Sequence, residues 1–302
     1  MKIAIHGLGR MGGQIARKLA EGGHEVIAHN RGKEPIDEAT KYGAIAAYAK
    51  SSVLSAFENQ RFMLWLMLPS EVVDSELEEW LKIAPVGSLF IDGGNSDFRQ
   101  TKIRAQSVAK KGSSLMDIGV SGGIWGYPNG FSMMVGGAKD DFEAIEPALK
   151  TLAVPKGAYG HFGARGAGHF VKMVHNAIEY GMMESLAEGY RILQEGPYEN
   201  LDLAAAGNVW HHGSVVNSWL NELSKEALAE NPKLEGIDGV VAESGETRWM
   251  LETARELNIE LPAIEAAFKV RLQSQKGDIN FATKLLAAMR NKFGGHDINP
   301  GK

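Results

Sequence analysis

A glycine-rich turn near the start of the chain restricts the possible folds more than any other feature. It matches the pattern G-x-G-x-x-G. The turn follows an apolar segment, Lys2–His6, that predicts a strand, and it opens a segment, Arg10–Glu21, with apolar residues at helical spacing. This order is typical of dinucleotide-binding units, in which the backbone approaches a pyrophosphate at a helix N-terminus. We therefore expect cofactor contacts from Gly7, Leu8, Gly9, Arg10, Met11 and Gly12.

The residues after the second predicted strand, Glu25–His29, bear on the choice of dinucleotide. An acidic residue there accepts hydrogen bonds from a ribose 2′-hydroxyl and repels a 2′-phosphate. This chain has Asn30, Arg31 and Lys33 instead, and a guanidinium suits a phosphate in charge and geometry. We favour NADP as the cofactor. NAD is the alternative, since an asparagine can bond a free hydroxyl and the two cations can be solvated turn residues. Leu68, at the end of a later apolar segment, is a further expected cofactor contact.

The two halves of the chain have different patterns. The first half alternates strands and helices, which indicates an α/β fold with a parallel, doubly wound sheet of the Rossmann type. From about Gly166 onward the pattern is helical only. We expect a dinucleotide-binding Rossmann domain over residues 1–160, and an all-α substrate and oligomerisation domain with a C-terminal tail over residues 161–302. The further predicted strands are Phe62–Leu68, Ser88–Asp92, Leu115–Ile118 and Phe131–Val135. The further predicted helices are Ser70–Leu81, Asp97–Lys111, Gly166–Gln194, Leu201–Trp210, Val215–Ala229, Glu246–Leu257, Ile264–Ser274 and Phe281–Lys292.

Composition argues against several classes of function. The 302 residues include no cysteine, which rules out disulfides, thiolate metal sites and a cysteine nucleophile. The formal net charge of −5 argues against a broad surface for nucleic acid or anionic membrane, and no apolar run reaches the ~18 residues of a membrane span. With no signal-peptide pattern either, we expect a cytoplasmic protein. We also expect no metal site, because His211 and His212 face different directions on a helix and no third ligand follows at regular spacing.

The helix predicted from Gly166 carries a row of polar residues. Lys172, His175, Asn176 and Glu179 stand at i, i+3, i+4 and i+7, so they share one face of an otherwise apolar helix. Polar groups on a buried helix need partners or a cavity. A lysine beside a bound nicotinamide can take the proton of a substrate hydroxyl, and a glutamate further along can be a second acid/base group. The alternative is a structural Lys–Glu pair on a solvated face.

Three other groups of residues are candidates for ligand contact. The segments Asp92–Ser96 and Val120–Gly123 follow predicted strands, at the sheet edge where doubly wound proteins bind ligands. Both can equally be ordinary turns. Three cations near the C-terminus can form an anion pocket, although spacing alone favours ordinary surface positions. These groups supply Asn95, Ser121, Gly122, Gly123, Arg271, Arg290 and His296.

Together these motifs resemble the decarboxylating 6-phosphogluconate dehydrogenases, in their short form, within the β-hydroxyacid dehydrogenase superfamily. The resemblance extends from Gly7 to His296, and the segment Lys172–Gly181 carries it most specifically. It implies oxidative decarboxylation of 6-phospho-D-gluconate to D-ribulose 5-phosphate and CO2, with reduction of NADP or NAD. In this reaction Lys172 would take the proton of the 3-hydroxyl and polarise the resulting ketone. Glu179 would protonate C1 of the enediol.

The resemblance also assigns the substrate contacts. It implies that the phosphate is held by Arg271, Arg290 and His296, the last two from a neighbouring subunit, so we expect a homodimer or homotetramer. The long form has a Lys and a Thr before its Trp, where this chain has Ser244–Trp249, which leaves phosphate contacts there open and makes Arg248 a candidate. The sugar acid would be held by Asn95, which also contacts the cofactor, and by Ser121, Gly122, Gly123, His175, Asn176 and Tyr180.

Two other functions are compatible with the sequence. One is a dehydrogenase or reductase of a small unphosphorylated 3-hydroxy acid, of the 3-hydroxyisobutyrate or tartronate semialdehyde type. That reaction would need neither the three C-terminal cations nor Glu179. The other is a nucleotide-sensing or scaffold protein, which would need neither Lys172 nor Glu179. The sequence leaves open whether the reaction serves a pentose phosphate or a gluconate catabolic route.

Overall fold

The computed structural model describes residues 1–58 and 60–299, and the chain divides into two compact units. Unit 1 is Met1–Lys172 and unit 2 is Met173–Lys302. The division falls after the predicted boundary at 160/161, because the first turns of helix α8 (Ala167–Glu195) belong with the sheet of unit 1.

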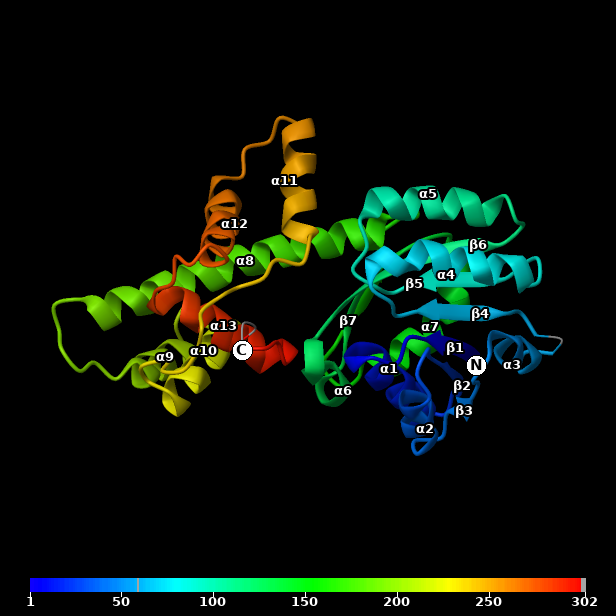
Figure 1. The fold of residues 1–302 in the computed structure, drawn as a ribbon, viewed down its shortest axis with the longest axis horizontal. Coiled ribbons are helices and arrows are strands. Elements are labelled where there is room, and N and C mark those ends of the chain that lie inside the picture. Colours follow the sequence, from blue (N-terminus) through cyan, green and yellow to red (C-terminus); the bar gives the residue numbers. More distant parts are fainter. Residues whose placement is uncertain (59, 300–302) are drawn as a thin grey trace. The chain divides into compact units, whose positions relative to one another are not determined.

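Unit 1 is built on an eight-stranded sheet with the order β3-β2-β1-β4-β5-β6-β7-β8 (Figure 1). The strands are β1 (Lys2–His6), β2 (Glu25–His29), β3 (Ile45–Ala46), β4 (Met63–Leu66), β5 (Leu89–Asp92), β6 (Ser114–Ser121), β7 (Ser132–Gly136) and β8 (Tyr159–His161). The helices are α1 (Arg10–Glu21), α2 (Glu34–Thr40), α3 (Lys50–Ser55), α4 (Ser70–Ile83), α5 (Phe98–Ala109), α6 (Gly126–Asn129) and α7 (Lys139–Ala153), with a 3₁₀ turn at Gly123–Trp125. The α/β class and the Rossmann-type sheet are thus confirmed.

Several details of this unit differ from the sequence prediction. Strand β7 is antiparallel to β6, because the connection between them is too short for the crossover of about a dozen residues that a parallel pair requires. The prediction also lacks β3, β8, α2 and α3, which are too short for a clear periodicity. It lacks α7 as well, whose interior contains Pro147, a residue that usually ends a helix.

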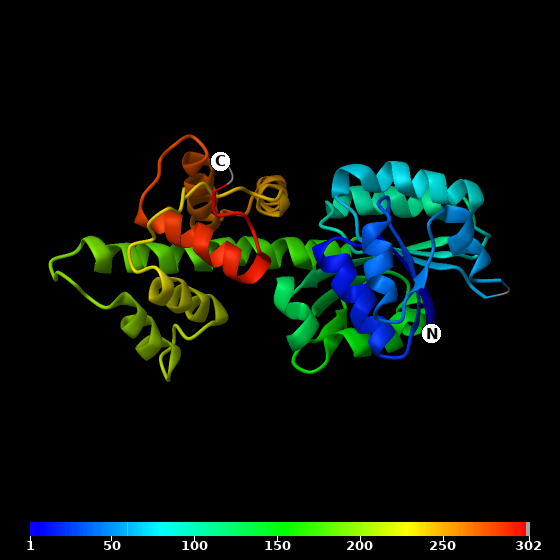
Figure 2. The same ribbon diagram turned by 60° about the horizontal axis from the view of Figure 1, so that its bottom comes forward.

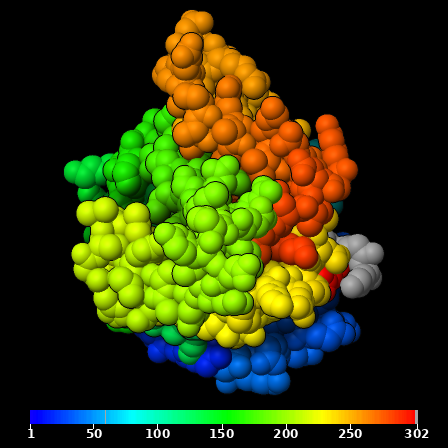
Figure 3. Space-filling model, turned by 90° about the vertical axis from the view of Figure 1, so that its left-hand side faces the viewer, coloured from blue at the N-terminus to red at the C-terminus, as the bar shows by residue number. Residues whose placement is uncertain are grey.

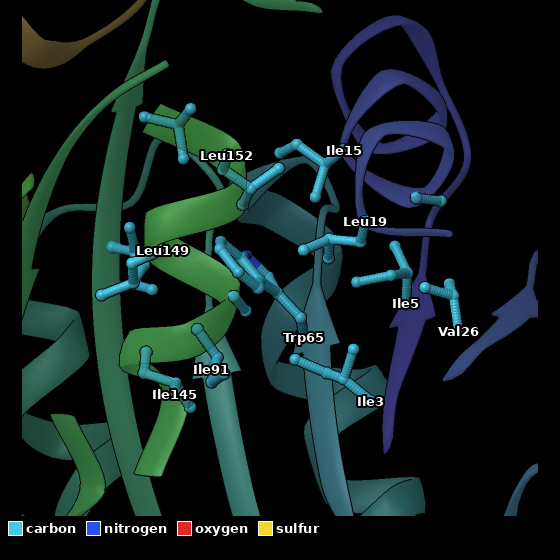
Figure 4. Packing of buried hydrophobic residues seen from close by; sticks show 14 of the residues in the cluster. Ile3, Ile5, Ile15, Leu19, Val26, Trp65, Ile91, Ile145, Leu149 and Leu152 are labelled. Carbon is cyan, nitrogen blue, oxygen red and sulfur yellow. The ribbon is translucent and has the colours of Figure 1, made fainter. Parts of the chain in front are cut away.

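Alternate residues of the central strands enter two hydrophobic cores, one on each face of the sheet. Ile3 and Ile5 point to one core and Ala4 to the other, as the two-residue period of a strand requires. The first core receives α1, α2 and α7, and the second receives α3, α4 and α5, so both faces are covered. Residues of the first core drawn in Figure 4 include Ile3, Ile5, Ile15, Leu19, Val26, Trp65, Ile91, Ile145, Leu149 and Leu152.

Up to residue 299, where the described part of the chain ends, unit 2 contains the rest of α8 and five further helices. They are α9 (Leu203–His211), α10 (Trp219–Glu230), α11 (Glu246–Glu256), α12 (Pro262–Ser274) and α13 (Phe281–Gly294). Within this unit, α9 and α10 lie on one side of α8, and α11 and α12 lie on the other (Figures 1 and 2). Figure 3 shows α11 and α12, in orange, standing out from the surface that α8, α9 and α10 form. No helix within residues 1–58 and 60–299 is long and apolar enough to cross a membrane.

The start of α10 differs from the predicted Val215. The helix begins at Trp219, where the side chain of Ser218 accepts a hydrogen bond from the backbone N–H of Asn221. A serine in this position satisfies one of the free N–H groups of the first turn and therefore sets the start of the helix. Val215 lies before this cap and is fully exposed.

Candidate active site

The glycine-rich turn leads from β1 into α1, and the strand order reverses next to it, between β1 and β4. Gly7 has a φ of +100°, and a Cβ there would lie 2.4 Å from the carbonyl oxygen of Met67. A Cβ at Gly12 would lie 1.9 Å from the carbonyl oxygen of Gly7, so only glycine fits at both positions.

The N-terminus of α1 offers space and hydrogen-bond donors to an anion. Among the described atoms nothing lies within 4 Å of the Cβ position of Gly9, the residue that precedes the helix. The first turn of α1 contains no acidic residue, and its N–H groups point out of the helix end. This arrangement fits the pyrophosphate of a dinucleotide. Leu68 lies beside the turn, since its Cδ2 atom is 2.8 Å from the Cβ position of Gly7.

Of the three residues expected to select the dinucleotide, Asn30 is held by hydrogen bonds, whereas Arg31 and Lys33 are exposed. The side chain of Asn30 accepts a hydrogen bond from the backbone N–H of Leu8 at 3.0 Å and donates one to the carbonyl of Gly32 at 3.3 Å. Asn30 therefore ties the end of β2 to the glycine-rich turn. Arg31 and Lys33 are exposed on the loop between β2 and α2. Of the turn residues, Arg10 is exposed, whereas Met11 packs against the core.

A buried charge network supports the loop that contains Asn95. Asp92, at the end of β5, accepts hydrogen bonds from the backbone N–H of Gly94 at 3.2 Å and the hydroxyl of Ser96 at 2.9 Å. Arg104, on α5, donates to Asp92 at 3.0 Å and to Ser96 at 2.9 Å. These side chains hold the Gly93–Gly94 backbone against the end of β4 and leave Asn95 exposed at the same edge of the sheet.

The second glycine segment ends β6. Ser121 is the last residue of the strand, and Gly122 and Gly123 follow it with φ angles of +128° and +54°. All three are half-buried. Ser121 thus lies at the end of a strand adjacent to β5, so the structure brings the segments of Asn95 and Ser121 to neighbouring strands.

The start of α8 is anchored to the sheet by Asp117, a fully buried residue of β6. Its two carboxylate oxygens accept hydrogen bonds from the backbone N–H groups of Gly166 at 2.6 Å and His169 at 2.8 Å. The His169 ring in turn pairs with the hydroxyl of Thr101, on α5, at 2.8 Å. Asp117 therefore acts as the N-terminal cap of α8, although it is distant in sequence.

Lys172 packs directly on the same strand. Its side chain is 7% exposed. A Cβ at Gly119 of β6 would lie 2.2 Å from the Cβ of Lys172, and one at Gly168 would lie 2.4 Å from the carbonyl oxygen of Met134. The absence of side chains at these glycines therefore sets the distance between α8 and the sheet, and with it the position of Lys172.

In unit 2, α8 continues with residues that contact α11. Asn176 is 9% exposed and donates a hydrogen bond from Nδ2 to Oε1 of Glu246 at 2.6 Å. Its Oδ1 lies 2.9 Å from Nδ1 of His175. Tyr180, also buried, accepts a hydrogen bond from the backbone N–H of Ser244 at 3.2 Å.

Two arginines lie close to Glu179 and Tyr180. The guanidinium of Arg271, on α12, stacks on the Tyr180 ring at 3.2 Å from its centre, and the residue is 2% exposed. Burial lowers the pKa of Arg271 to about 10, against the opposing effects of Tyr180 and Glu179. Burial also lowers the pKa of Arg290, on α13, which Tyr180, Glu179 and Glu246 oppose. Within the described part of the chain neither guanidinium has a salt-bridge partner, so an anion would be a favourable occupant.

The structure also places the remaining candidates for the substrate phosphate. Arg290, which the resemblance assigned to a site shared with a neighbouring subunit, is within electrostatic range of Glu179 of its own chain. Arg248 forms a salt bridge with Glu243 at an exposed position. His296 is half-buried after the end of α13, with its ring beside Phe293.

Three residues of the site were not found from the sequence: Asp92, Asp117 and Glu246. Each is at most 2% exposed, and each holds a segment that carries a predicted site residue. Asp92 and Asp117 carry a recognisable signal, since an acidic residue inside an apolar strand needs hydrogen-bond donors. Glu246 has no such signal in the sequence, because an acidic residue in the first turn of a helix is common at exposed positions.

The geometry can be compared with known proteins. Residues 2–162 match the family described as "NAD binding domain of 6-phosphogluconate dehydrogenase", and residues 168–297 match "6-phosphogluconate dehydrogenase, C-terminal domain". The chain belongs to the 6-phosphogluconate dehydrogenase family. It is a dehydrogenase of this family, with a dinucleotide-binding domain and a helical domain in the order expected from the sequence.

Relatives in the 6-phosphogluconate dehydrogenase family extend over the whole chain. An NAD(+)-dependent, decarboxylating 6-phosphogluconate dehydrogenase from Haloferax volcanii is 33% identical over 99% of this chain and 98% of its own length. The Plasmodium falciparum 6-phosphogluconate dehydrogenase, whose structures include complexes with NADP+ and 6-phosphogluconate, has a TM-score of 0.81 at 26% identity. That match covers 100% of this chain and 67% of the Plasmodium chain.

A solved structure of lower sequence identity shares the fold alone. The 3-hydroxyisobutyrate dehydrogenase of Mycobacterium tuberculosis, in a structure with L-serine, has a TM-score of 0.73 at 22% identity. The match covers 94% of this chain and 97% of the Mycobacterium chain. The fold is therefore common to enzymes with phosphorylated and unphosphorylated substrates, and the side chains of the site have to distinguish them.

Proposed function

We propose that this protein catalyses the oxidative decarboxylation of 6-phospho-D-gluconate to D-ribulose 5-phosphate and CO2. The observation that carries this proposal is the pair of guanidinium groups of Arg271, which is buried, and Arg290, which is half-buried, near Glu179 and without a salt-bridge partner among the described residues. Cations withdrawn from water are costly unless an anion compensates them, and the phosphate of the substrate supplies that anion. A small unphosphorylated acid lacks this phosphate and would leave the two guanidinium groups with only the longer-range electrostatic effects of Glu179, Glu184 and Glu246.

The reaction needs two proton-transfer groups, and α8 carries both. Bound NADP or NAD supplies the acceptor for the hydride that leaves C3. Lys172 takes the proton of the 3-hydroxyl, and its ammonium then polarises the C3 ketone while the bond between C1 and C2 breaks and CO2 leaves. Glu179 then donates a proton to the former C2 of the substrate, which becomes C1 of ribulose 5-phosphate. Simple alcohol oxidation requires the first proton transfer only, so Glu179 favours the decarboxylating reaction.

The remaining residues are proposed to bind and orient the two ligands. The glycine-rich turn and the N-terminus of α1 hold the pyrophosphate, and Arg31 contacts the 2′-phosphate, which favours NADP over NAD. We also propose a homodimer or homotetramer, since α8 exposes apolar side chains that a partner chain can cover. The substrate contacts are Asn95, Ser121, Gly122, Gly123, His175, Asn176, Tyr180 and His296.

One assay tests the proposal. The protein is given 6-phosphogluconate labelled at C1 with NADP or NAD, and reduced nicotinamide and labelled CO2 are measured together. We expect equal amounts of both, with NADP as the better cofactor. Hydride transfer without CO2, or activity on 3-hydroxyisobutyrate but not on 6-phosphogluconate, would contradict the proposal.

Two variants test the roles on α8. Lys172→Met is expected to lower the rate of both products by a factor of about 10² to 10⁴, the usual contribution of a general base. Glu179→Gln is expected to slow the overall reaction and to preserve substrate binding. Glu188→Gln, at an exposed position of the same helix, is the matched control and should keep the original rate. Wild-type turnover in either of the first two variants would show that the role assigned to that residue is wrong.

A further inference from the structure

The carboxamide of Asn176 links two other side chains of unit 2. Its Nδ2 lies 2.6 Å from Oε1 of Glu246, and its Oδ1 lies 2.9 Å from Nδ1 of His175. Asn176 and Glu246 are 9% and 2% exposed, so water does not compete for this bond. The Asn176–Glu246 distance is at the short end for an N–H···O hydrogen bond, as expected when the acceptor is charged.

The chemistry of these three groups allows one arrangement of hydrogens. An ionised carboxylate only accepts hydrogen bonds, so Asn176 has to present its NH2 group to Glu246. The carbonyl oxygen of Asn176 then faces His175, and it also only accepts. Nδ1 of His175 must therefore carry a hydrogen, and in the neutral ring Nε2 is the nitrogen with the lone pair.

Glu246 is held in place for this role. It occupies the first turn of α11, where the helix dipole favours a negative charge. Its Oε2 atom is buried and has no hydrogen-bond partner among the described residues, so the bond to Asn176 is its main polar contact. The positive charge of Arg290 is within electrostatic range and offsets the charge of the carboxylate.

We propose that Glu246 is a positioning residue that acts through Asn176 to fix His175 in the Nδ1–H tautomer, so that Nε2 accepts a hydrogen bond from a hydroxyl of the polyhydroxy acid substrate. His175 stands between Lys172 and Glu179 on the same helix face, so its tautomer determines which groups of a substrate the face can bind. The inference about the substrate hydroxyl rests on the proposed function. The tautomer itself does not.

The experiment compares the wild-type protein with Glu246→Gln. Glutamine has nearly the same shape but can donate as well as accept, so the Asn176 amide is free to turn over and present its NH2 group to His175. The histidine nitrogens are followed by ¹⁵N NMR in the substrate-free protein, and the His175 signals are identified by their loss in His175→Gln. We expect the Nδ1–H tautomer in the wild type, and a population of the Nε2–H tautomer in Glu246→Gln.

Kinetics supply the second measurement. In Glu246→Gln the KM for 6-phosphogluconate is expected to rise about tenfold, as for the loss of one hydrogen bond, with an unchanged KM for the dinucleotide. Glu256→Gln is the matched control, because it makes the same chemical change at an exposed position near the other end of α11, and it should change neither measurement.

Two results would overturn the inference. One is an Nε2–H tautomer of His175 in the wild-type protein, which needs no variant to be observed. The other is an unchanged tautomer in a folded Glu246→Gln protein. Asn176→Leu removes the same link from the other side and replaces Glu246→Gln if that variant does not fold. Because the NMR measurement needs no turnover, a lack of activity on 6-phosphogluconate would refute the proposed function without affecting the tautomer result.

Discussion

The packing of Lys172 against β6 leads to a quantitative prediction for Gly119→Ala. The new methyl group would lie 2.2 Å from the Cβ of Lys172 and 2.7 Å from its Cγ. Carbon atoms pack at about 3.5–4.0 Å, so the lysine and the strand must separate by roughly 1.3 Å or more. Overpacking of this kind costs about 1–3 kcal/mol, which is less than the ~5–15 kcal/mol stability of a typical domain, so the protein should still fold.

The expected effect on the reaction is larger than the effect on stability. A misplacement of about 1 Å in a catalytic group can lower the rate by a factor of about 10², and we expect a decrease in kcat of this size. Affinity for the dinucleotide should be unchanged, because the glycine-rich turn connects β1 to α1 and does not involve β6. The assay is the initial rate of nicotinamide reduction at saturating substrate, together with dinucleotide binding by fluorescence and the thermal midpoint.

Gly189→Ala is the control for Gly119→Ala. Gly189 is in the interior of α8, and among the described atoms nothing lies within 4 Å of its Cβ position. Alanine there should raise stability by about 0.5–1 kcal/mol without a change in kcat. If Gly119→Ala folds and retains kcat within twofold of the wild type, then the packing of α8 on β6 does not set the position of the reactive group, and the reasoning is refuted.

Three further predictions concern the cofactor, the α8 anchor and pH. Arg31→Ala should raise the KM for NADP at least tenfold more than the KM for NAD, and equal effects in the two titrations would remove the argument for NADP. Asp117→Asn should lower the free energy of unfolding by about 1.5–3 kcal/mol, because one of two charge-assisted bonds is lost, and an unchanged denaturation midpoint would contradict the capping role. Burial raises the pKa of Glu184 to about 7 from its ordinary 4.5, with Glu188 adding to the rise, so folding favours the protonated form and this contribution to stability is lost as the pH rises from about 4.5 to 7. The difference in thermal midpoint between Glu184→Gln and the wild type should therefore be more positive at pH 8 than at pH 5. The same difference at both pH values would count against this explanation.

Local patterns in the sequence determined the class of the fold and the order of its two parts. The glycine-rich turn and the bounds of β1 and β2 follow from short-range rules, because a strand, a tight turn and a helix N-terminus each have local chemical requirements. The row from Lys172 to Glu179 was likewise visible, since residues that share a helix face need only the helical period to be recognised.

Tertiary structure decided which side chains complete the site. Asp117 and Gly119, on one strand, hold the start of α8, while Glu246 meets Asn176 across 70 residues of sequence. The antiparallel β7 and the approach of Arg290 to Glu179 depend in the same way on how distant elements pack. Such contacts leave no periodic signal, because the geometry that joins them arises only when the helices and the sheet have assembled.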